Sequence, residues 1–454
     1  MRGLIQLRAL ALATVLALAA AQAGATRPAA RPIRIAILSD CKGPYRGGYE
    51  LNIGGAQAAF YQYAGARPKD RYRPSAGMVG GSIAGRPVKL LYGCGDTTVT
   101  TALTETRRLL EQRGADIMIG PISGDEAVAI ARYANAHPQK TFVIGAASQE
   151  PTLQIAPKNV FRYHGDGAQW NAGLGEIVYR KLGWRTAALV VDDYSFGWTA
   201  AAGIVADFCA IGGKIVTRLY PSLNTADYSP YIRALPPPDR VDGYFWAVGG
   251  TGADAALETF EQTYGRIKPS QHAGLLFFAE RYARQLIGAY SGGFGGASGL
   301  KTKQAHDYEA LMARWHPALP PADGFTYNYY NAAWATIRGL RASGGDTGIA
   351  LQTAMPLTNK SAYEVSNGGV LKLDTNRQAI QDQFPLRIVS GPHRSPRLAV
   401  VALVPNVDQS FGGVFTKSSP PPGRTQPPCK KRALPWQGKI RLVQNGVVTR
   451  HFLR

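Results

Sequence analysis

The chain has few residues of the kinds that usually carry out chemistry. It holds four cysteines and seven histidines in 454 residues, and none of them has a CxxC or Cys/His spacing typical of a metal site. It also lacks GxSxG, HExxH, a P-loop, and a GxGxxG that follows a strand. Asp192 and Asp193 resemble paired carboxylates, but adjacent residues leaving a strand point to opposite sides. The sequence therefore predicts no catalytic residue, no metal and no cofactor.

Acidic residues are scarce relative to basic ones. The chain has 51 Lys and Arg against 30 Asp and Glu, a formal charge of +21. From Gly391 onward there are eleven basic residues and one acidic residue, so this tail alone carries +10. The remaining body is only mildly basic for its size. We therefore expect a basic tail that is solvated or lies on an acidic surface, and no nucleic-acid partner.

Long apolar runs are absent except at the N-terminus. Residues 1–25 contain two arginines, an apolar run that ends at Ala21, and the small-residue sequence Ala23-Gly24-Ala25. This order is typical of a secretory signal peptide, and the run is shorter than the ~20 residues of a membrane-spanning helix. No cysteine precedes Cys41, so no lipid-anchoring cysteine follows the run. We expect cleavage of residues 1–25 and a freely diffusing protein in a Gram-negative periplasm.

Export permits disulfide bonds among the four cysteines. Cys41 follows the first predicted strand and Cys94 follows the second. The ends of neighbouring parallel strands lie close together, so the sequence predicts a Cys41–Cys94 bridge. Cys209 lies on a predicted helix and Cys429 in the tail. A bond between them is suggested only because they are the two cysteines left over, and Cys209 could equally be a buried thiol.

Strands and helices alternate along the body of the chain. A second series of alternating strands and helices begins after residues 160–162. Strands are predicted at residues 33–38, 88–92, 117–119, 141–144, 186–191, 214–219, 243–248, 274–278 and 384–389. Helices are predicted at residues 54–64, 101–113, 126–136, 169–182, 197–211, 228–234, 253–264 and 326–342. Such alternation indicates an α/β protein with two units of parallel sheet and right-handed crossovers. In the tail, residues 418–428 are Pro-rich, and Asn445-Gly446 predicts a hairpin.

Two loops that follow predicted strands have the composition of a binding site. Strand 117–119 breaks at Gly120-Pro121, and Ser123 opens a helix whose free backbone N–H groups suit an anion. An ordinary helix cap is the alternative role for Ser123. Strand 141–144 is followed by Gly145-Ala146-Ala147-Ser148. In an open α/β sheet such loops line the crevice where ligands bind.

Five segments in order resemble one family of binding proteins. They are Lys42-Gly43-Pro44-Tyr45 with residues 52–56, then Gly85-Arg86-Pro87, Gly120-Pro121-Ile122-Ser123, Asp192-Asp193-Tyr194-Ser195-Phe196-Gly197, and Asp374-Thr375-Asn376-Arg377. Together they resemble the type I solute-binding proteins of ABC transporters, which include the leucine/isoleucine/valine receptors. The similarity covers roughly residues 33–389.

The resemblance implies two Rossmann-like lobes with parallel sheets, joined by three hinge strands. Lobe 1 would comprise residues 33–161 with a return segment at about 290–360. Lobe 2 would comprise residues 162–289 with about 361–390. Residues 391–454 would form a basic, Pro-rich C-terminal extension that either packs on lobe 2 or projects freely.

The resemblance also implies a ligand site between the lobes. The Ser123 and Ser148 hydroxyls would hold a carboxylate, Phe196 would close over the ligand or pack at a helix start, and Glu280 would pair with an ammonium group or remain a surface charge. The full implied set is Tyr45, Ser123, Gly124, Ala146, Ala147, Ser148, Tyr194, Phe196, Trp246 and Glu280. This chain departs from the receptors at Asp125 and Glu126, which suit the first turn of a helix but could repel an anion.

The expected function is that of a monomeric periplasmic receptor. It would close around a small polar ligand, an amino acid or a related carboxylate or amide, and deliver it to an inner-membrane ABC permease. Ligand would stabilise the closed form because only there do both lobes contact it. A sensory or regulatory protein of the same fold is the alternative, and an exported α/β enzyme is a weaker third.

Overall fold

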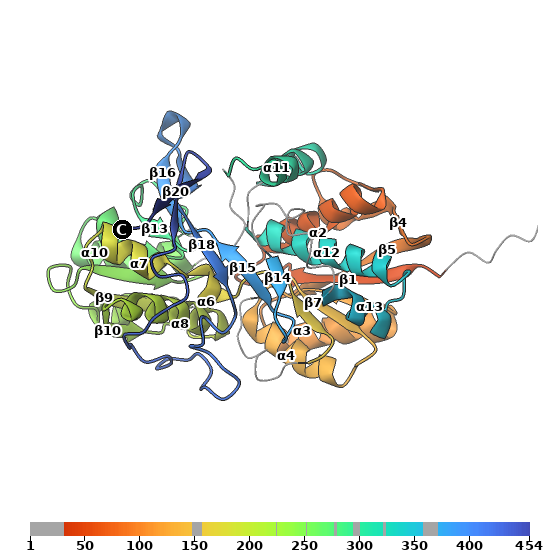
Figure 1. The fold of residues 1–454 in the computed structure, drawn as a ribbon, viewed down its shortest axis with the longest axis horizontal. Coiled ribbons are helices and arrows are strands. Elements are labelled where there is room, and N and C mark those ends of the chain that lie inside the picture. Colours follow the sequence, from red (N-terminus) through yellow and green to blue (C-terminus); the bar gives the residue numbers. More distant parts are fainter. Residues whose placement is uncertain are drawn as a thin grey trace, which may run out of the picture.

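The computed structural model describes residues 31–147, 157–223, 225–250, 252–276, 279–293, 300–320, 324–356 and 371–454. The predicted signal peptide lies outside them. Two α/β lobes lie side by side, with strands β14 (Leu371–Leu373) and β15 (Ala379–Gln383) between them (Figure 1). The chain passes between the lobes three times: after β8 (Val160–Arg162), between β13 (Tyr290–Ser291) and helix α11 (Lys303–Trp315), and through β14 and β15.

Lobe 1 is built on a six-stranded sheet with the order β4-β5-β1-β6-β7-β8. Its other strands are β1 (Ile33–Asp40), β4 (Ser82–Ile83), β5 (Arg86–Gly95), β6 (Ile117–Ile119) and β7 (Thr141–Ile144). All neighbours pair in parallel except β4, which forms a hairpin with β5. A small separate sheet joins β2 (Ala66–Pro68) to β3 (Met78–Gly80), next to the short helix η1 (Pro74–Ala76).

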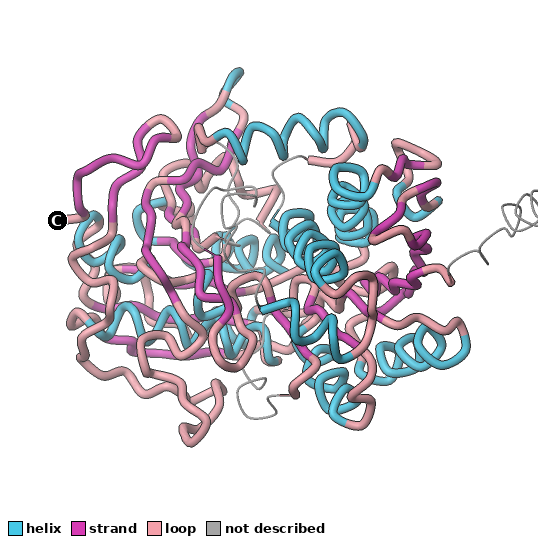
Figure 2. Tube along the Cα trace, turned by 45° about the vertical axis from the view of Figure 1, so that its right-hand side comes forward, coloured by secondary structure: helices cyan, strands magenta, loops and turns pink. Residues whose placement is uncertain are grey.

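Helices cover both faces of the lobe-1 sheet, which Figure 2 shows from a second angle. They are α2 (Gly48–Ala64), α3 (Val99–Arg107), η2 (Arg108–Gln112), α4 (Gly124–Asn135), α11, α12 (Gly324–Ala342) and α13 (Ile349–Ala354). Ile33, Ile35 and Ile37 of β1 pack with α2 and α12, whereas Ala36 and Leu38 pack with α3 and α4. This period of two is the side-chain alternation of a strand that is buried on both faces.

Glycine allows α2 and α12 to pack in close contact. A Cβ atom at Gly55 would lie 2.1 Å from the Thr326 carbonyl oxygen, so no larger residue fits there without moving a helix. This contact holds the return segment of the chain against lobe 1.

Lobe 2 is built on a seven-stranded sheet with the order β10-β9-β11-β12-β13-β16-β17. Its strands are β9 (Thr186–Val191), β10 (Lys214–Leu219), β11 (Gly243–Ala247), β12 (His272–Gly274), β13, β16 (Leu386–Ser390) and β17 (Pro396–Val400). Its helices are α6 (Gly167–Trp170), α7 (Leu174–Lys181), α8 (Ser195–Ala210), α9 (Ser229–Arg233), α10 (Gly252–Tyr264), η3 (Pro269–Gln271) and η6 (Pro392–Arg394). The first five strands are parallel, and β16 and β17 add to them in antiparallel fashion.

Several predicted elements differ in their bounds from those in the structure. The helix expected at 169–182 is broken into α6 and α7 because Gly173 adopts φ 79°, where a Cβ would lie 2.5 Å from Val404. The helix expected at 101–113 continues beyond Arg107 as the π-helical turn η2. The strand expected at 274–278 is β12, which ends at Gly274 with φ 123°.

The C-terminal extension is part of lobe 2. After β17, strands β18 (Ala402–Val407), β19 (Arg441–Gln444) and β20 (Val447–Phe452) form a five-stranded sheet with β14 and β15. Phe411 and Trp436 pack in one cluster with Ala202 and Ala206 of α8. A disulfide joins Cys209 to Cys429, with 5.3 Å between their Cα atoms. Of the two arrangements that the sequence left open, the structure therefore has the extension packed on lobe 2.

No helix among the described residues is long and apolar enough to cross a lipid bilayer.

Candidate ligand site between the two lobes

The two lobes have the same strand order around their central strands. Lobe 1 reads β5-β1-β6-β7-β8 and lobe 2 reads β10-β9-β11-β12-β13, which is the order 2-1-3-4-5 in each case. In open α/β sheets of this order, ligands bind at the carboxyl ends of the first and third strands, where the connections leave to opposite faces. These switch points are β1/β6 in lobe 1 and β9/β11 in lobe 2, and the candidate site is formed at both.

The lobe-1 switch point holds a pair of buried carboxyl groups. Asp40 is the last residue of β1, and Glu126 lies in the first turn of α4. A Cβ at Gly95 would lie 2.2 Å from Asp40 Oδ1 and 2.9 Å from Glu126 Oε1, so both side chains reach the same point. Burial raises the pKa of Asp40 to about 7 and that of Glu126 above its usual range. A side-chain hydrogen bond between the two groups lowers the pKa of Asp40 and raises that of Glu126, so Glu126 is the protonated donor and Asp40 the acceptor.

The N-terminus of α4 faces the N-terminus of α8 in lobe 2. Ser123 is the N-cap residue of α4, and its backbone N–H donates to Glu126 Oε2 at 3.3 Å. The backbone N–H of Ser195, the first residue of α8, donates to Asp125 Oδ1 at 3.4 Å. The Ser123 hydroxyl accepts from the Glu126 backbone N–H in a capping box, whereas the buried Ser195 hydroxyl finds no hydrogen-bond partner among the described residues. The two lobes therefore meet here through a carboxylate of the chain itself.

The lobe-2 switch point holds a third buried carboxyl group. Asp192 directly follows β9, and its Oδ2 atom accepts a hydrogen bond from the Gly249 N–H, 2.7 Å away beyond β11. Its Oδ1 atom has no partner among the described residues. Burial raises the pKa of Asp192 well above its usual range. The hydrogen bond from Gly249 opposes this shift only in part.

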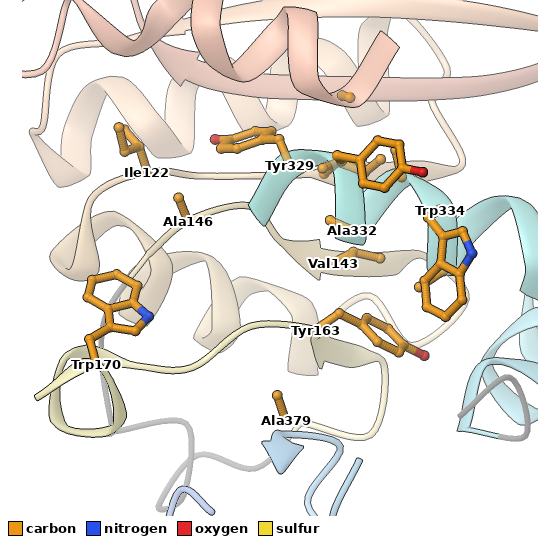
Figure 3. Packing of buried hydrophobic residues seen from close by; sticks show 14 of the residues in the cluster. Ile122, Val143, Ala146, Tyr163, Trp170, Tyr329, Ala332, Trp334 and Ala379 are labelled. Carbon is orange, nitrogen blue, oxygen red and sulfur yellow. The ribbon is translucent and has the colours of Figure 1, made fainter. Parts of the chain in front are cut away.

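Aromatic side chains close the space between the switch points. The hydroxyl groups of Tyr45 in lobe 1 and Tyr194 in lobe 2 form a buried hydrogen bond. The Phe196 ring lies 5.8 Å from that of Tyr194 and 6.4 Å from that of Trp170. Figure 3 shows Trp170 at the same end of the buried cluster as Ile122 and Ala146 of lobe 1. These contacts between rims describe a closed arrangement of the lobes.

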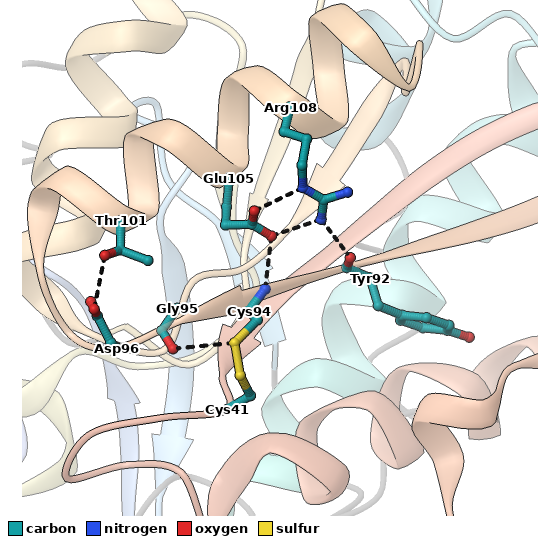
Figure 4. The surroundings of a disulfide bond; sticks show 8 residues. All are labelled: Cys41, Tyr92, Cys94, Gly95, Asp96, Thr101, Glu105 and Arg108. Carbon is teal, nitrogen blue, oxygen red and sulfur yellow. Dashed lines mark hydrogen bonds and ion pairs between the residues drawn. A yellow bond between two sulfur atoms is a disulfide. The ribbon is translucent and has the colours of Figure 1, made fainter.

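A disulfide fixes the rim of lobe 1 beside Asp40. It joins Cys41, which directly follows β1, to Cys94, the last residue but one of β5 (Figure 4). The two Cα atoms lie 5.1 Å apart. Glu105 of α3 accepts a hydrogen bond from the Cys94 N–H at 3.0 Å and pairs with Arg108 at 2.7 Å. The two disulfides in the structure are the two pairings that the sequence suggested.

The structure brings together most of the residues expected to bind ligand. Tyr45, Tyr194 and Phe196 meet between the lobes, and the buried residues Ser123, Gly124, Ala146 and Ala147 follow strands β6 and β7. Ser148 lies outside the described residues.

Two expected site residues lie elsewhere. The Trp246 side chain does not form a wall of the cleft: it stacks on His272, 5.8 Å between centroids, in the lobe-2 core with Phe260. Successive strand residues point to opposite faces, and this position faces α10. Glu280 is exposed, and among the described residues no hydrogen bond or ion pair joins its carboxylate to the cleft.

Sequence reasoning missed the acidic residues as a group, although a signal was present. The first strand of each lobe runs into an aspartate, Asp40 after residues 33–39 and Asp192 after residues 186–191. A tyrosine follows each, five residues on at Tyr45 and two residues on at Tyr194. The sequence thus repeats an aspartate followed by a tyrosine at the end of the first strand of each lobe. No group of three or more His, Cys, Asp or Glu residues in the described ranges could hold a metal ion.

Two α/β lobes with facing switch points and a buried contact between their rims define a two-lobed ligand-binding protein. A family model described as periplasmic binding protein matches residues 32–392, and the chain belongs to this family. The resemblance noted in the sequence is thus confirmed, as is the main fold of two α/β lobes with parallel sheets.

Solved structures of similar fold include substrate- and solute-binding proteins of ABC transporters. An ABC transporter substrate-binding protein from Sphaerobacter thermophilus is 19% identical with a TM-score of 0.69, covering 84% of this chain and 99% of its own. A solute-binding protein from R. palustris in complex with benzoate is 16% identical with a TM-score of 0.66, covering 81% and 96%. A leucine-binding protein from Thermotoga maritima is 15% identical with a TM-score of 0.64, covering 82% and 99%. Comparison with curated proteins gives no match.

Proposed function

We propose that the protein is a receptor that captures a small polar solute between its lobes and delivers it to an ABC importer. The observation that supports this most is the meeting of the two switch points, where Tyr45 and Asp125 of lobe 1 contact Tyr194 and Ser195 of lobe 2. A solute held there would touch both lobes only in the closed form and would stabilise that form. Capture requires no reaction, so the receptor is not an enzyme.

The expected ligand is an amino acid or a related carboxylate or amide. Relatives of similar fold were solved with benzoate or are named for leucine, so the family fold accommodates ligands of both kinds. The buried hydroxyl of Ser195 has no partner among the described residues and is available to bind a polar group of such a ligand, and the Ser123 hydroxyl can donate its proton to the same group.

The proposed location is the periplasm, reached through cleavage of the signal peptide over residues 1–25. There the receptor would act as a monomer and dock on an inner-membrane permease. Closure would present the permease with a shape that the empty, open receptor lacks.

Native mass spectrometry of protein purified without denaturation tests the proposal. We expect a retained small molecule, and we expect that molecule to raise the melting temperature as its concentration increases. Ser123→Ala and Phe196→Ala should weaken this effect, whereas Glu280→Gln, a change at an exposed acid outside the cleft contacts, should leave it intact. Turnover of the retained molecule would contradict a receptor role.

A further inference from the structure

Each switch point buries carboxyl groups that no cationic side chain among the described residues neutralises. Besides each other, the titratable groups that interact with Asp40 and Glu126 are Asp96, Tyr45 and Tyr329, none of them a cation. Those around Asp192 are Tyr45, Tyr194 and Tyr228. Among the described residues no Lys, Arg or His forms an ion pair with Asp40, Glu126 or Asp192, and all three side chains are buried. Buried carboxylates are costly unless a cation or several hydrogen bonds compensate them.

The backbone donors that would hold an anionic ligand are already occupied. The Ser123 N–H donates to Glu126, the Ser195 N–H to Asp125, and the Gly249 N–H to Asp192. A ligand carboxylate would have to displace one of these carboxylates and then lie beside it. The helix N-termini thus satisfy the chain's own acids rather than an anion from solution.

What the cleft offers a ligand is acceptors and aromatic faces. Asp192 Oδ1 and the Ser195 hydroxyl have no hydrogen-bond partner among the described residues, and the buried Asp40 carboxyl forms no ion pair with a cation there. The rings of Tyr45 and Phe196 lie close to Asp192, since a Cβ at Gly249 would lie 2.5 Å from the Tyr45 hydroxyl and 3.4 Å from both Asp192 Oδ2 and Phe196. Tyr194 and Trp170 flank Phe196. Aromatic faces attract organic cations, most strongly where water is excluded.

We propose that the captured solute is an organic cation that places an ammonium group between Asp192 of lobe 2 and the Asp40–Glu126 pair of lobe 1. This inference rests on the proposed receptor function, and it narrows the ligand from any amino acid, carboxylate or amide to one that carries a cationic amine. All three carboxyl groups are buried without a cationic partner among the described residues, and an ammonium group placed between them would offset the cost of ionising them. A short diamine, or an amine with a second strong donor, matches both lobes at once and pulls them together.

Calorimetric titration with a panel of defined solutes tests the inference. The cationic probes are 1,4-diaminobutane, agmatine and lysine, and the comparison probes are leucine, benzoate and 4-hydroxybenzoate. We expect at least one cationic probe to bind at least tenfold more tightly than every comparison probe. Benzoates, which carry a negative charge and no amine, should bind weakest.

Isosteric variants test which carboxyl groups bind the cationic probe. Asp192→Asn and Asp40→Asn should each weaken binding of the cationic probe by about 10- to 100-fold, the loss expected for one charge-assisted hydrogen bond. Asp116→Asn is the matched control, because Asp116 lies before β6 at the opposite edge of the sheet and pairs with Lys140 at 3.6 Å. Melting curves of the empty proteins establish that each variant is folded. A structural role alone for Asp192 would lower the melting temperature without changing the preference for cations.

The outcomes separate this inference from the receptor function. Binding of leucine or a benzoate in preference to all cations, or unchanged affinity in both cleft variants, overturns the cationic ligand and leaves the receptor intact. If no probe binds and no small molecule is retained on purification, the receptor function itself fails, and this inference fails with it.

Discussion

At the scale of single residues, the Asp40–Glu126 pair links the site to the stability of the empty protein. Burial raises the pKa of Asp40 to about 7, above the value near 3.9 of an unfolded aspartate. The stability that this group contributes is complete below about pH 4 and is lost as the pH rises through about 7. We predict that Asp40→Asn removes this loss and stabilises the protein relative to wild type by on the order of 2 kcal/mol at pH 8.

Urea unfolding at pH 5 and at pH 8 measures the effect. The difference in free energy of unfolding between Asp40→Asn and wild type should grow as the pH rises, while Asp116→Asn should show no such growth. An equal difference at both pH values would mean that Asp40 does not titrate between them.

Tyr194 gives a second prediction at this scale. Tyr194→Phe removes the hydroxyl that bonds to Tyr45 across the cleft but keeps the ring against Phe196. A hydrogen bond contributes about 1 kcal/mol net, so ligand affinity should fall about fivefold while the melting temperature of each lobe changes little. Tyr45→Phe should give the same loss, and the double variant should be no worse than either single one. Additive losses in a double-mutant cycle would contradict a direct bond between the two hydroxyls.

At the scale of elements, the C-terminal extension is held to lobe 2 as firmly as a core segment. Trp436 is 1% exposed, its Nε1 donates to Asp207 of α8 at 2.9 Å, and its ring lies 4.7 Å from that of Phe411. We predict that Trp436→Ala lowers the free energy of unfolding by about 3–5 kcal/mol. Lys431→Ala, at an exposed position of the same segment, should have almost no effect. A stability unchanged in Trp436→Ala would show that the extension detaches in solution.

The extension also reaches the rim of the ligand site. Arg424 forms a two-pronged ion pair with Asp193, which lies between Asp192 and Tyr194. Asp193 also accepts a hydrogen bond from the Trp198 indole at 3.0 Å. This pair holds the pKa of Asp193 below its usual range. The basic tail therefore neutralises Asp193, while no cationic side chain among the described residues pairs with Asp192 next to it.

The sequence predicts a helix or strand well where neighbouring residues determine its bounds. It predicts poorly where contacts with residues far along the chain determine those bounds or the direction of a side chain. The periodicity of two in β1 and the start of α4 at Ser123 can be read directly from the residues. The break between α6 and α7 cannot, because it depends on Val404 packing against Gly173 from the extension. Likewise, Trp246 ends a strand beside the cleft, and only the path of α10 decides that its ring faces the core.

At the scale of the whole molecule, the two lobes are related by pseudo-symmetry. Each lobe has the same strand order, an aspartate at the end of its first strand, and a tyrosine that contacts the tyrosine of the other lobe. The chain crosses between the lobes three times, and we expect these crossings to favour rotation of one lobe relative to the other over sliding. Rotation of this kind changes the distance between α4 and α8 more than any distance within a lobe.

A cross-link between α4 and α8 therefore reports closure. The four native cysteines are all in disulfides, so Asp125→Cys with Ser195→Cys adds the two reactive thiols, at positions whose Asp125 Oδ1 and Ser195 N atoms lie 3.4 Å apart. We predict that a short bifunctional thiol reagent joins them slowly in the empty protein, and that the rate rises and saturates with ligand concentration. Each single-cysteine variant serves as the control for labelling without cross-linking. A rate that does not respond to a ligand already known to bind would contradict closure of the lobes.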